Sequence, residues 1–419
     1  MFKNFHANSP TARAHLSRFL QGELVGDDGA PVAAATSAPA GDAAAAAFEL
    51  DVRALADAAK AEGLFDANLL YYAWKFASTV ALAAGAAWAT AAGAAAGSVG
   101  AQLCGAGLLA LFWQQCGWLA HDFAHHQVFK SRPLNDVGVL VVGNLFQGFS
   151  CEWWKNKHNT HHAVPNLHES KAGLHDGDPD IDTLPFLAWS ARMLEKAGEF
   201  SPAARALLAW QAWTYFPLLL FARLTWAMQS FSFAFEFEDG MFANNEVAVR
   251  RKVAAEKGGR ARGLKYAFAE RALIVAHYAW TFALCFGATS SPAVGLAHLL
   301  VAQCGCGLLL AVAFGLGHNG MAVHDAHARP GFAALQVSTT RNVANDALGL
   351  TGWFMGGLHL QIEHHLVPGV PRHNLAALAP RLQALCKKHN VPYRCTGMFD
   401  GTEEVLRHLA EVVKDFPAA

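Results

Sequence analysis

The amino-acid sequence predicts an all-α integral membrane protein with four transmembrane helices in two hairpins and a cytoplasmic helical cap. The first reason is composition, since 53% of the residues are hydrophobic and only 16% are charged, against about 25% charged in typical soluble domains. The second is a pair of long stretches without charged residues. The third is a set of three histidine clusters beside these stretches, so we expect the cap to hold a histidine-rich di-metal site.

The first part of the chain differs from the rest. Residues 1–25 are polar and basic rather than apolar, which argues against a cleavable signal peptide. Residues 26–47 are rich in Ala, with Ser, Thr and Pro, and predict a flexible linker. We therefore expect the main domain to occupy residues 48–419.

Two uncharged stretches supply the predicted membrane spans. Phe76–Ala120 and Ala272–Val323 contain no Asp, Glu, Lys or Arg, and each has room for two helices of roughly 20 residues. The small residues of Ala91–Gly100 and the GATSSPA stretch of Gly287–Ala293 predict the hairpin turns. Because basic residues precede the second hairpin while both turns are uncharged, the charged side is expected to be cytoplasmic.

The segment between the hairpins decides whether all three histidine clusters lie on one side. Leu207–Phe235 contains Arg223 near its middle and many aromatic residues, a pattern typical of helices at a membrane interface. We expect an interfacial helix pair there, because a single crossing would put the third cluster on the opposite face. The tail, Pro371–Ala419, predicts helices that cover the cap.

Charge and cysteine content exclude other classes of protein. A net charge of −1 provides no basic surface for nucleic acid. The eight cysteines include no CxxC pair, which argues against a disulfide framework or a zinc–cysteine site and favours a reducing compartment.

The histidine clusters have the spacing of metal ligands on helices. Residues three or four apart share one helix face. The clusters are HDFAHH with His121, His125 and His126, HNTHH with His158, His161 and His162, and QIEHH with Gln361, His364 and His365. A catalytic zinc takes about three protein ligands, so this number of nitrogens favours two metal ions. Imidazole alone does not choose among iron, zinc, copper and nickel.

Five strings together form a specific pattern. They are WLAHDFAHHQVF (Trp118–Phe129), WWKNKHNTHHAVPN (Trp153–Asn166), DPDIDTLP (Asp178–Pro185), TTRNV (Thr339–Val343) and GWFMGGLHLQIEHHLVPGVPRHN (Gly352–Asn374). This pattern resembles the integral-membrane fatty acid desaturases, specifically the front-end group, over about Phe48 to His389. Gln361, in place of the first histidine of the third box, is the mark of that group.

The resemblance implies a di-iron enzyme that uses dioxygen to leave a cis double bond in a long-chain polyunsaturated acyl group. It implies Gln361 as a catalytic residue, either a ligand or a group that orients one. The implied metal ligands are His121, His125, His126, His158, His161, His162, His318, His364 and His365. Of these, His318 occupies the place of a further histidine after the fourth span, and His126 is replaced in some members of the group.

The resemblance extends to the start of the chain. Front-end desaturases usually carry an N-terminal cytochrome b5 domain with an HPGG haem motif, which this sequence lacks. Phe2–Leu24 is similar to the last third of such a domain, with His6 at the place of the second axial haem ligand. We interpret residues 1–25 as a remnant in which His6 is vestigial. Electrons would then come from a separate cytochrome b5 and its reductase, or from a ferredoxin-like donor.

Other functions stay open at this point. A sphingolipid long-chain-base desaturase shares all three boxes, and a membrane hydroxylase uses the same scaffold. A histidine-rich metal transporter would place its histidines within the spans, whereas these clusters lie outside them. The resemblance implies an endoplasmic reticulum protein that acts on membrane lipid or acyl-CoA, and it leaves regioselectivity and oligomeric state open.

Some nearby polar residues have plainer interpretations. His277 and His298 lie within predicted spans, and we expect them to form interhelical hydrogen bonds. Asp178 and Asp180 are expected to form a turn.

Overall fold

The computed structural model describes residues 40–169, 177–195, 200–237, 244, 247, 251, 263–326 and 330–416. His6, the predicted remnant of residues 1–25 and most of the predicted linker lie outside the described residues. Residues 40–47 of that linker form the beginning of helix α3 (Ala40–Ala61). The helix begins before the predicted boundary at residue 48 because alanine has the highest helix propensity.

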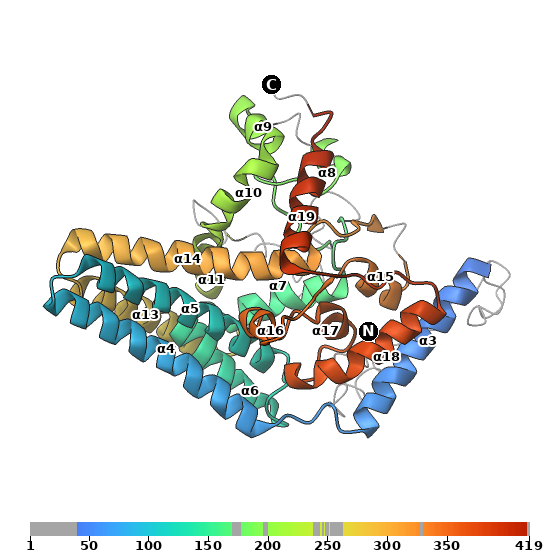
Figure 1. Ribbon diagram of the computed structural model, residues 1–419, viewed down its shortest axis with the longest axis horizontal. Helices are drawn as coiled ribbons and strands as arrows, with labels where there is room; N and C mark the ends of the chain where they lie inside the picture. The colour runs from blue at the N-terminus through green and yellow to red at the C-terminus, as the bar shows by residue number, and fades with distance from the viewer. Residues whose placement is uncertain are drawn as a thin grey trace.

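Helices dominate the described residues, which confirms the predicted helical class (Figure 1). After α3 they are α4 (Leu69–Ala95), α5 (Val99–Ala124), α6 (Arg132–Val139), the π-helix η2 (Leu140–Gln147), α7 (Cys151–Ala163), α8 (Ala191–Glu195), α9 (Pro202–Ala209), α10 (Gln211–Leu219), α11 (Ala222–Ala234), α13 (Ala267–Phe282), the π-helix η4 (Ala283–Gly287), α14 (Pro292–His318), α15 (Phe332–Ser338), α16 (Leu350–Phe354), α17 (Gln361–Leu366), the 3-10 helix η6 (Arg372–Asn374), α18 (Leu375–Lys388) and α19 (Met398–Val412). Strands β1 (Asn342–Val343) and β2 (Cys395–Thr396) form one short parallel pair.

Three helices in the described part of the chain, α4, α5 and α14, are long and apolar enough to cross a membrane. The fourth predicted span corresponds to α13, whose 16 residues continue directly into η4 and end at Gly287. Figure 1 shows α4, α5, α13 and α14 side by side in one bundle. Three of the four predicted spans thus have the length and composition of membrane helices, and the fourth changes helix type along its course.

The first hairpin turns where small residues predict it. The turn occupies the residues between α4 and α5, and the Ser98 hydroxyl accepts a hydrogen bond from the backbone N–H of Ala101 at 3.2 Å to cap α5. Gly105 permits close packing of the two helices, since a Cβ there would lie 2.3 Å from Oγ1 of Thr90. Small residues at a contact let membrane helices approach closely.

The segment Leu207–Phe235 contains the expected pair of helices, α10 and α11, after the last three residues of α9. Arg223 in α11 is only 1% exposed. The expectation that it lies at a membrane interface is therefore wrong. The guanidinium lies 3.9 Å from the centre of the Trp113 ring and donates to Oε1 of Gln303 at 2.5 Å. The charge is tolerated inside the bundle because these partners replace water.

The predicted interhelical hydrogen bonds of the intramembrane histidines are present. His298 in α14 lies 2.9 Å from Oγ1 of Thr90 in α4. His277 in α13 lies 3.2 Å, through Nδ1, from the carbonyl oxygen of Leu145 in η2. Both rings are buried, and each ties two helices together.

The remaining helices form a cap at one end of the bundle (Figure 1). Helices α7 and α17 lie at its centre, and α3 packs beside α18 through an apolar cluster that includes Phe48 and Leu378. Helix α10 packs beside α19, where Nε2 of Gln211 donates to the carbonyl oxygen of Leu409 at 2.9 Å. Helices α18 and α19 confirm the prediction of helical structure after Pro371.

Candidate metal centre

Five histidine side chains converge where α5 meets the cap. His121 and His125 come from the end of α5, His158 and His162 from α7, and His364 from α17. Their Nε2 atoms form a chain in which His121 and His364 are 3.1 Å apart, His364 and His162 3.1 Å, His162 and His158 3.0 Å, and His158 and His125 3.0 Å. One ligand atom from each of the five lies within 4.8 Å of all the others. We call this set the five-histidine group.

A second group adjoins the first and combines neighbouring residues of α7 and α17 with one residue of α14. It consists of His161 from α7, His318 at the end of α14 and His365 from α17. Nε2 of His161 lies 3.3 Å from Nε2 of His318, and the rings of His161 and His365 have their centres 5.0 Å apart. We call this set the three-histidine group. The rings of His162 and His365, one from each group, stack with centres 4.2 Å apart.

Gln361 lies beside the three-histidine group. Its Nε2 atom is 2.8 Å from Nε2 of His318, and its Oε1 atom is buried without a hydrogen-bond partner. The oxygen and nitrogen of an amide are assigned rather than distinguished by shape. Turning the amide over would present the unpartnered oxygen to the group as a fourth donor.

The geometry of both groups fits metal ions. Two ligands at right angles, each about 2.1 Å from an ion, lie about 3.0 Å apart, which is the spacing of 3.0–3.1 Å in the five-histidine group. Nε2 of His365 is buried and has no hydrogen-bond partner. Buried polar atoms normally have partners, so an ion between these nitrogens would satisfy them.

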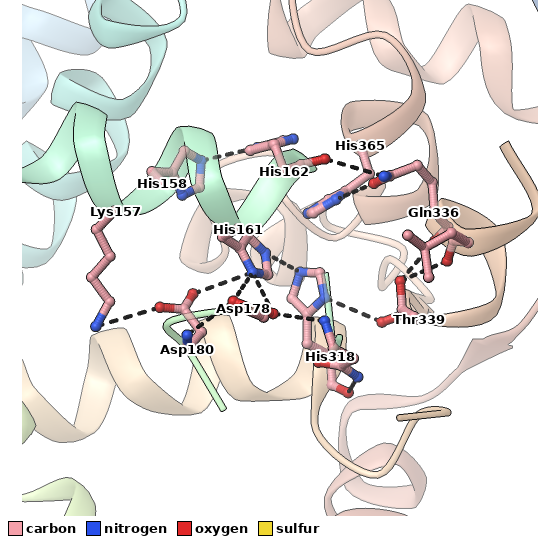
Figure 2. Close-up of polar contacts among 12 residues, drawn as sticks. Lys157, His158, His161, His162, Asp178, Asp180, His318, Gln336, Thr339 and His365 are labelled. Atoms are coloured by element: carbon pink, nitrogen blue, oxygen red, sulfur yellow. Dashed lines mark hydrogen bonds and ion pairs between the residues drawn. The ribbon is translucent and has the colours of Figure 1, made fainter. Parts of the chain in front are cut away.

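Residues behind the rings hold several of the histidines in place (Figure 2). Nδ1 of His161 donates to the Asp178 carboxylate at 3.0 Å. His318 and His365 are held through Nδ1 by the carbonyl oxygen of Thr339 at 3.2 Å and by Oε1 of Gln336 at 2.9 Å. A partner on Nδ1 fixes the tautomer and the ring orientation, so that Nε2 faces the centre.

The five-histidine group has a similar support. Nδ1 of His121 lies 3.3 Å from Oδ1 of Asp122. The other carboxylate oxygen of Asp122 accepts from Nε of Arg372 at 2.5 Å, and the Arg372 guanidinium also donates to the Trp118 carbonyl oxygen. A buried ion pair therefore connects the first histidine cluster to η6, which follows the third cluster in the chain.

Burial keeps most of the histidines neutral. It lowers the pKa of His125, His158, His162, His364 and His365 well below 6.5. His161 is the exception: burial acts to lower its pKa, but the carboxylates of Asp178 and Asp180 outweigh this effect and raise it to about 9. Neutral imidazole is the form that binds a metal.

Two predicted site residues stand apart. His126 belongs to neither group, and its backbone is left-handed (φ 57°) directly after α5. Burial lowers the pKa of His126 to about 4. His6 lies outside the described residues.

Sequence reasoning missed the supporting residues. Asp178 and Asp180 do make a local turn, in which the N–H of Asp180 donates to Oδ1 of Asp178 at 2.9 Å, but Asp178 also supports His161. Gln336 carries no signal in the sequence, because it lies far from every histidine cluster along the chain. The DPDIDTLP string was the available signal for Asp178.

A buried cluster of imidazoles at the end of apolar helices long enough to cross a membrane is the arrangement expected of a membrane metalloprotein. The model of the family described as "Fatty acid desaturase" matches residues 99–397. The chain belongs to the fatty acid desaturase family, and the prediction of an oxidoreductase of this family is confirmed.

Named relatives agree with this assignment. An acyl-lipid (9-3)-desaturase of Physcomitrium patens is 36% identical over 84% of this chain and 61% of its own length. The Delta(6)-fatty-acid desaturase fat-3 of Caenorhabditis elegans is 36% identical over 85% of this chain and 73% of its own length. A Delta(8)-fatty-acid desaturase of Euglena gracilis is 33% identical over 86% of this chain and 78% of its own length.

Proposed function

We propose that this protein is a front-end desaturase. It would introduce a cis double bond between an existing double bond and the carboxyl end of a long-chain polyunsaturated acyl group. The observation that carries the proposal is the pairing of a five-histidine group with a three-histidine group that Gln361 completes. The relatives named as Delta(6) and Delta(8) desaturases support the same class of substrate.

Two iron ions fit the two groups. The five-histidine group would hold one, and the three-histidine group, with Gln361 as ligand or orienting residue, would hold the other. When bound, the iron pair would supply the activation of dioxygen that breaking an unreactive C–H bond requires. His126 has no place in either group, so we assign it no ligand role.

The protein's own contribution is to orient the ligands and exclude water. Asp178 and Gln336 hold Nδ1 of His161 and His365, which leaves Nε2 directed at the centre. His162 and His365 are both 0% exposed, so bulk water is kept from the region between the groups. A dry site prevents side reactions of a strong oxidant.

The reaction consumes one dioxygen, two electrons and two protons for each double bond. Two neighbouring C–H bonds of the acyl chain break, the C=C bond forms, and both oxygen atoms leave as water. The electrons would come from a separate cytochrome b5 with its reductase, or from a ferredoxin-like donor. The acyl group would arrive on a membrane lipid or on coenzyme A.

We also propose four membrane spans, with α13 and η4 together as the fourth. Their helical course from Ala267 to Gly287 is uninterrupted, and a helix of roughly 20 residues crosses the hydrocarbon core. Both hairpins would then return to the side of the histidine centre, which we assign to the cytoplasmic face of the endoplasmic reticulum. Residues 48–419 would form the desaturase domain.

Expression in yeast with a co-expressed cytochrome b5 tests the proposal. The cells are fed candidate polyunsaturated acids, and mass spectrometry locates any new double bond. We expect it on the carboxyl side of an existing one, with about two iron ions per purified chain. The variant His364→Ala should lose the product, whereas His389→Ala, on a histidine outside both groups, should retain it.

The same cells distinguish the alternatives. A new double bond confined to sphingolipid long-chain bases would favour the long-chain-base desaturase, and a hydroxylated acyl chain would favour the hydroxylase. Metal flux with an unchanged lipid profile would contradict an enzyme of either kind. Each of these products is resolved in the same lipid extract.

A further inference from the structure

Large apolar side chains are exposed in an unusual pattern in the last part of the chain. From residue 320 to residue 416, only four large hydrophobic side chains are exposed among the described residues. They are Leu348 at 83%, Leu350 at 59%, Trp353 at 38% and Phe399 at 88%. No described helix in this range is a candidate membrane span.

The fold starts the two segments that carry these residues from the same end of one strand pair. Strands β1 and β2 are parallel, with Asn342 opposite Cys395 and Val343 opposite Thr396. The pairing continues one step further, since the N–H of Ala344 donates to the carbonyl oxygen of Thr396 at 2.8 Å. Both chains therefore leave the ladder at the same end, one into the turn before α16 and the other into the first turn of α19.

Side-chain hydrogen bonds hold the turn before α16 in one conformation. The Asp346 carboxylate accepts from the N–H groups of Leu348 and Thr351 at 2.9 and 2.5 Å. The side-chain oxygen of Asn345 accepts from the N–H of Gly352 at 2.9 Å. These bonds satisfy backbone donors that would otherwise need water, so the turn can present Leu348 and Leu350 to an apolar medium.

Helix α16 is attached to a candidate span. The carbonyl oxygen of Phe354 accepts from Nε1 of Trp118 at 2.9 Å and from Nε2 of Gln114 at 3.0 Å, both in α5. Gln114 lies seven residues before His121, which places it about 10 Å further into the bundle along the helix. Figure 1 shows α16 where the bundle meets the cap, with α6 below the bundle and α10 above α14.

Exposed apolar side chains occur in α6 and α10 as well. Leu134 and Val137 of α6 are 52% and 54% exposed, and Trp213 of α10 is 79% exposed. Aromatic and aliphatic side chains at this level are typical of the boundary between headgroups and acyl chains. The exposed side chains of α16 are therefore not the only apolar ones that the described residues expose outside the candidate spans.

We propose that the Leu348–Leu350 turn and Phe399 insert into the lipid leaflet next to the histidine centre. The partner is the headgroup–acyl boundary of the bilayer, and the insertion is driven by apolar contact. It would attach the part of the chain that follows the last candidate span to the leaflet on the side of the histidine centre. The proposal concerns membrane attachment and is independent of the reaction.

Site-specific photocrosslinking in the full chain tests this inference. The amino acid p-benzoylphenylalanine is placed at Leu348, or at Phe399, and the protein is reconstituted in phosphatidylcholine vesicles. Irradiation followed by mass spectrometry should give phospholipid adducts at both positions. The readout does not depend on desaturase activity, so failure of the proposed function leaves the test intact.

Two matched controls define the expected contrast. Leu50 is an apolar residue, 63% exposed, on α3, which lies far from the bundle in Figure 1. The side chain of Arg407 is 73% exposed and lies about 12 Å further along α19 than Phe399, roughly 80° around the helix from it. We expect at least about tenfold more lipid adduct at Leu348 and Phe399 than at the controls. Equal yields at all four positions, or adducts to a second copy of the chain in place of lipid, would overturn the proposal.

Discussion

Nδ1 of His161 donates a hydrogen bond to the Asp178 carboxylate at 3.0 Å, while Nε2 of the same ring lies 3.3 Å from Nε2 of His318. The carboxylate is buried and lies in a loop, whereas the ring belongs to α7. This pair fixes the direction of one ligand of the three-histidine group. A carboxylate behind an imidazole also strengthens it as a metal ligand.

Replacing Asp178 with Asn should weaken metal binding at the three-histidine group. The backbone N–H groups of Asn166 and Asp180 bond to different carboxylate oxygens of Asp178. An Asn keeps one oxygen and can accept from one of them, so part of the support of the loop is retained. The charge behind His161 is lost, and we expect activity to fall by about 10- to 100-fold. Iron content per chain checks the prediction, and Asp182→Asn, at an exposed residue of the same loop, serves as control. Full iron occupancy and activity in Asp178→Asn would contradict it.

Gln361 should matter through its amide rather than its size. We expect Gln361→Leu to lose at least about tenfold in activity and to bind less than two iron ions per chain. Gln361→Glu should retain the iron, because a carboxylate oxygen can take the place of the amide oxygen. Elemental analysis of the purified variants measures the iron content per chain. An unchanged iron content in Gln361→Leu would show that Gln361 is not needed to bind the metal.

Chelation should release iron in two phases. The three-histidine group offers fewer imidazoles than the five-histidine group, and affinity falls with the number of ligands. A chelator titration followed by elemental analysis should therefore show one ion lost first. Asp178→Asn should accelerate only this first phase. Simultaneous release of both ions would argue against two unequal sites.

Acid should remove a contribution of Asp136 to stability. Burial acts to raise the pKa of Asp136, but hydrogen bonds from Lys155 and Lys265 outweigh it and lower the pKa to about 2, from an ordinary 3.8. A carboxyl whose pKa is depressed by folding stabilises the protein above its unfolded pKa. The contribution is therefore full at pH 5 to 7 and is lost as the pH falls from about 4 toward 2.

Thermal unfolding in detergent measures this effect. Asp136→Asn should unfold at a lower temperature than the unchanged protein at pH 7, because Lys155 and Lys265 lose their charged partner. The difference should narrow below pH 4. A constant difference between pH 7 and pH 3 would show that the charge of Asp136 contributes nothing.

Two glycines with left-handed backbones should respond differently to alanine. Gly148 has φ 86°, and a Cβ there would lie 2.3 Å from Cδ2 of His277. Gly97 has φ 66° and no atom within 4 Å of the same position. Gly97→Ala should cost about 1–2 kcal/mol in free energy of unfolding, and Gly148→Ala roughly a further 1–3 kcal/mol because the His277 ring must move. Equal melting temperatures for the two variants would refute this account.

Features that are local in sequence could be predicted before the structure. Absence of charge marks α4, α5 and α14 because a membrane span must be apolar along its whole length. The spacing of His158, His161 and His162 marks α7 as a ligand-bearing helix because residues three or four apart share a face. The family pattern added His318 and Gln361, which spacing alone would not have selected.

The division of the ligands is a property of the tertiary structure alone. Neighbours such as His161 and His162, or His364 and His365, join different groups, because successive residues of a helix point about 100° apart. Which direction faces which group depends on how α5, α7, α14 and α17 are packed. The positions of these histidines in the sequence do not predict how the helices pack.

The same reason explains where sequence reasoning went wrong. Arg223 looked like a residue of a membrane interface, but Trp113 and Gln303, far from it in the chain, receive its side chain inside the bundle. Gln336 supports His365 only because α15 lies beside α17. Residue types and their order in the chain show which side chains can bind metal and which segments are apolar enough for a membrane. The two unequal histidine groups and their supporting residues follow from the packing of the helices, because both consist of contacts between residues that lie far apart in the chain.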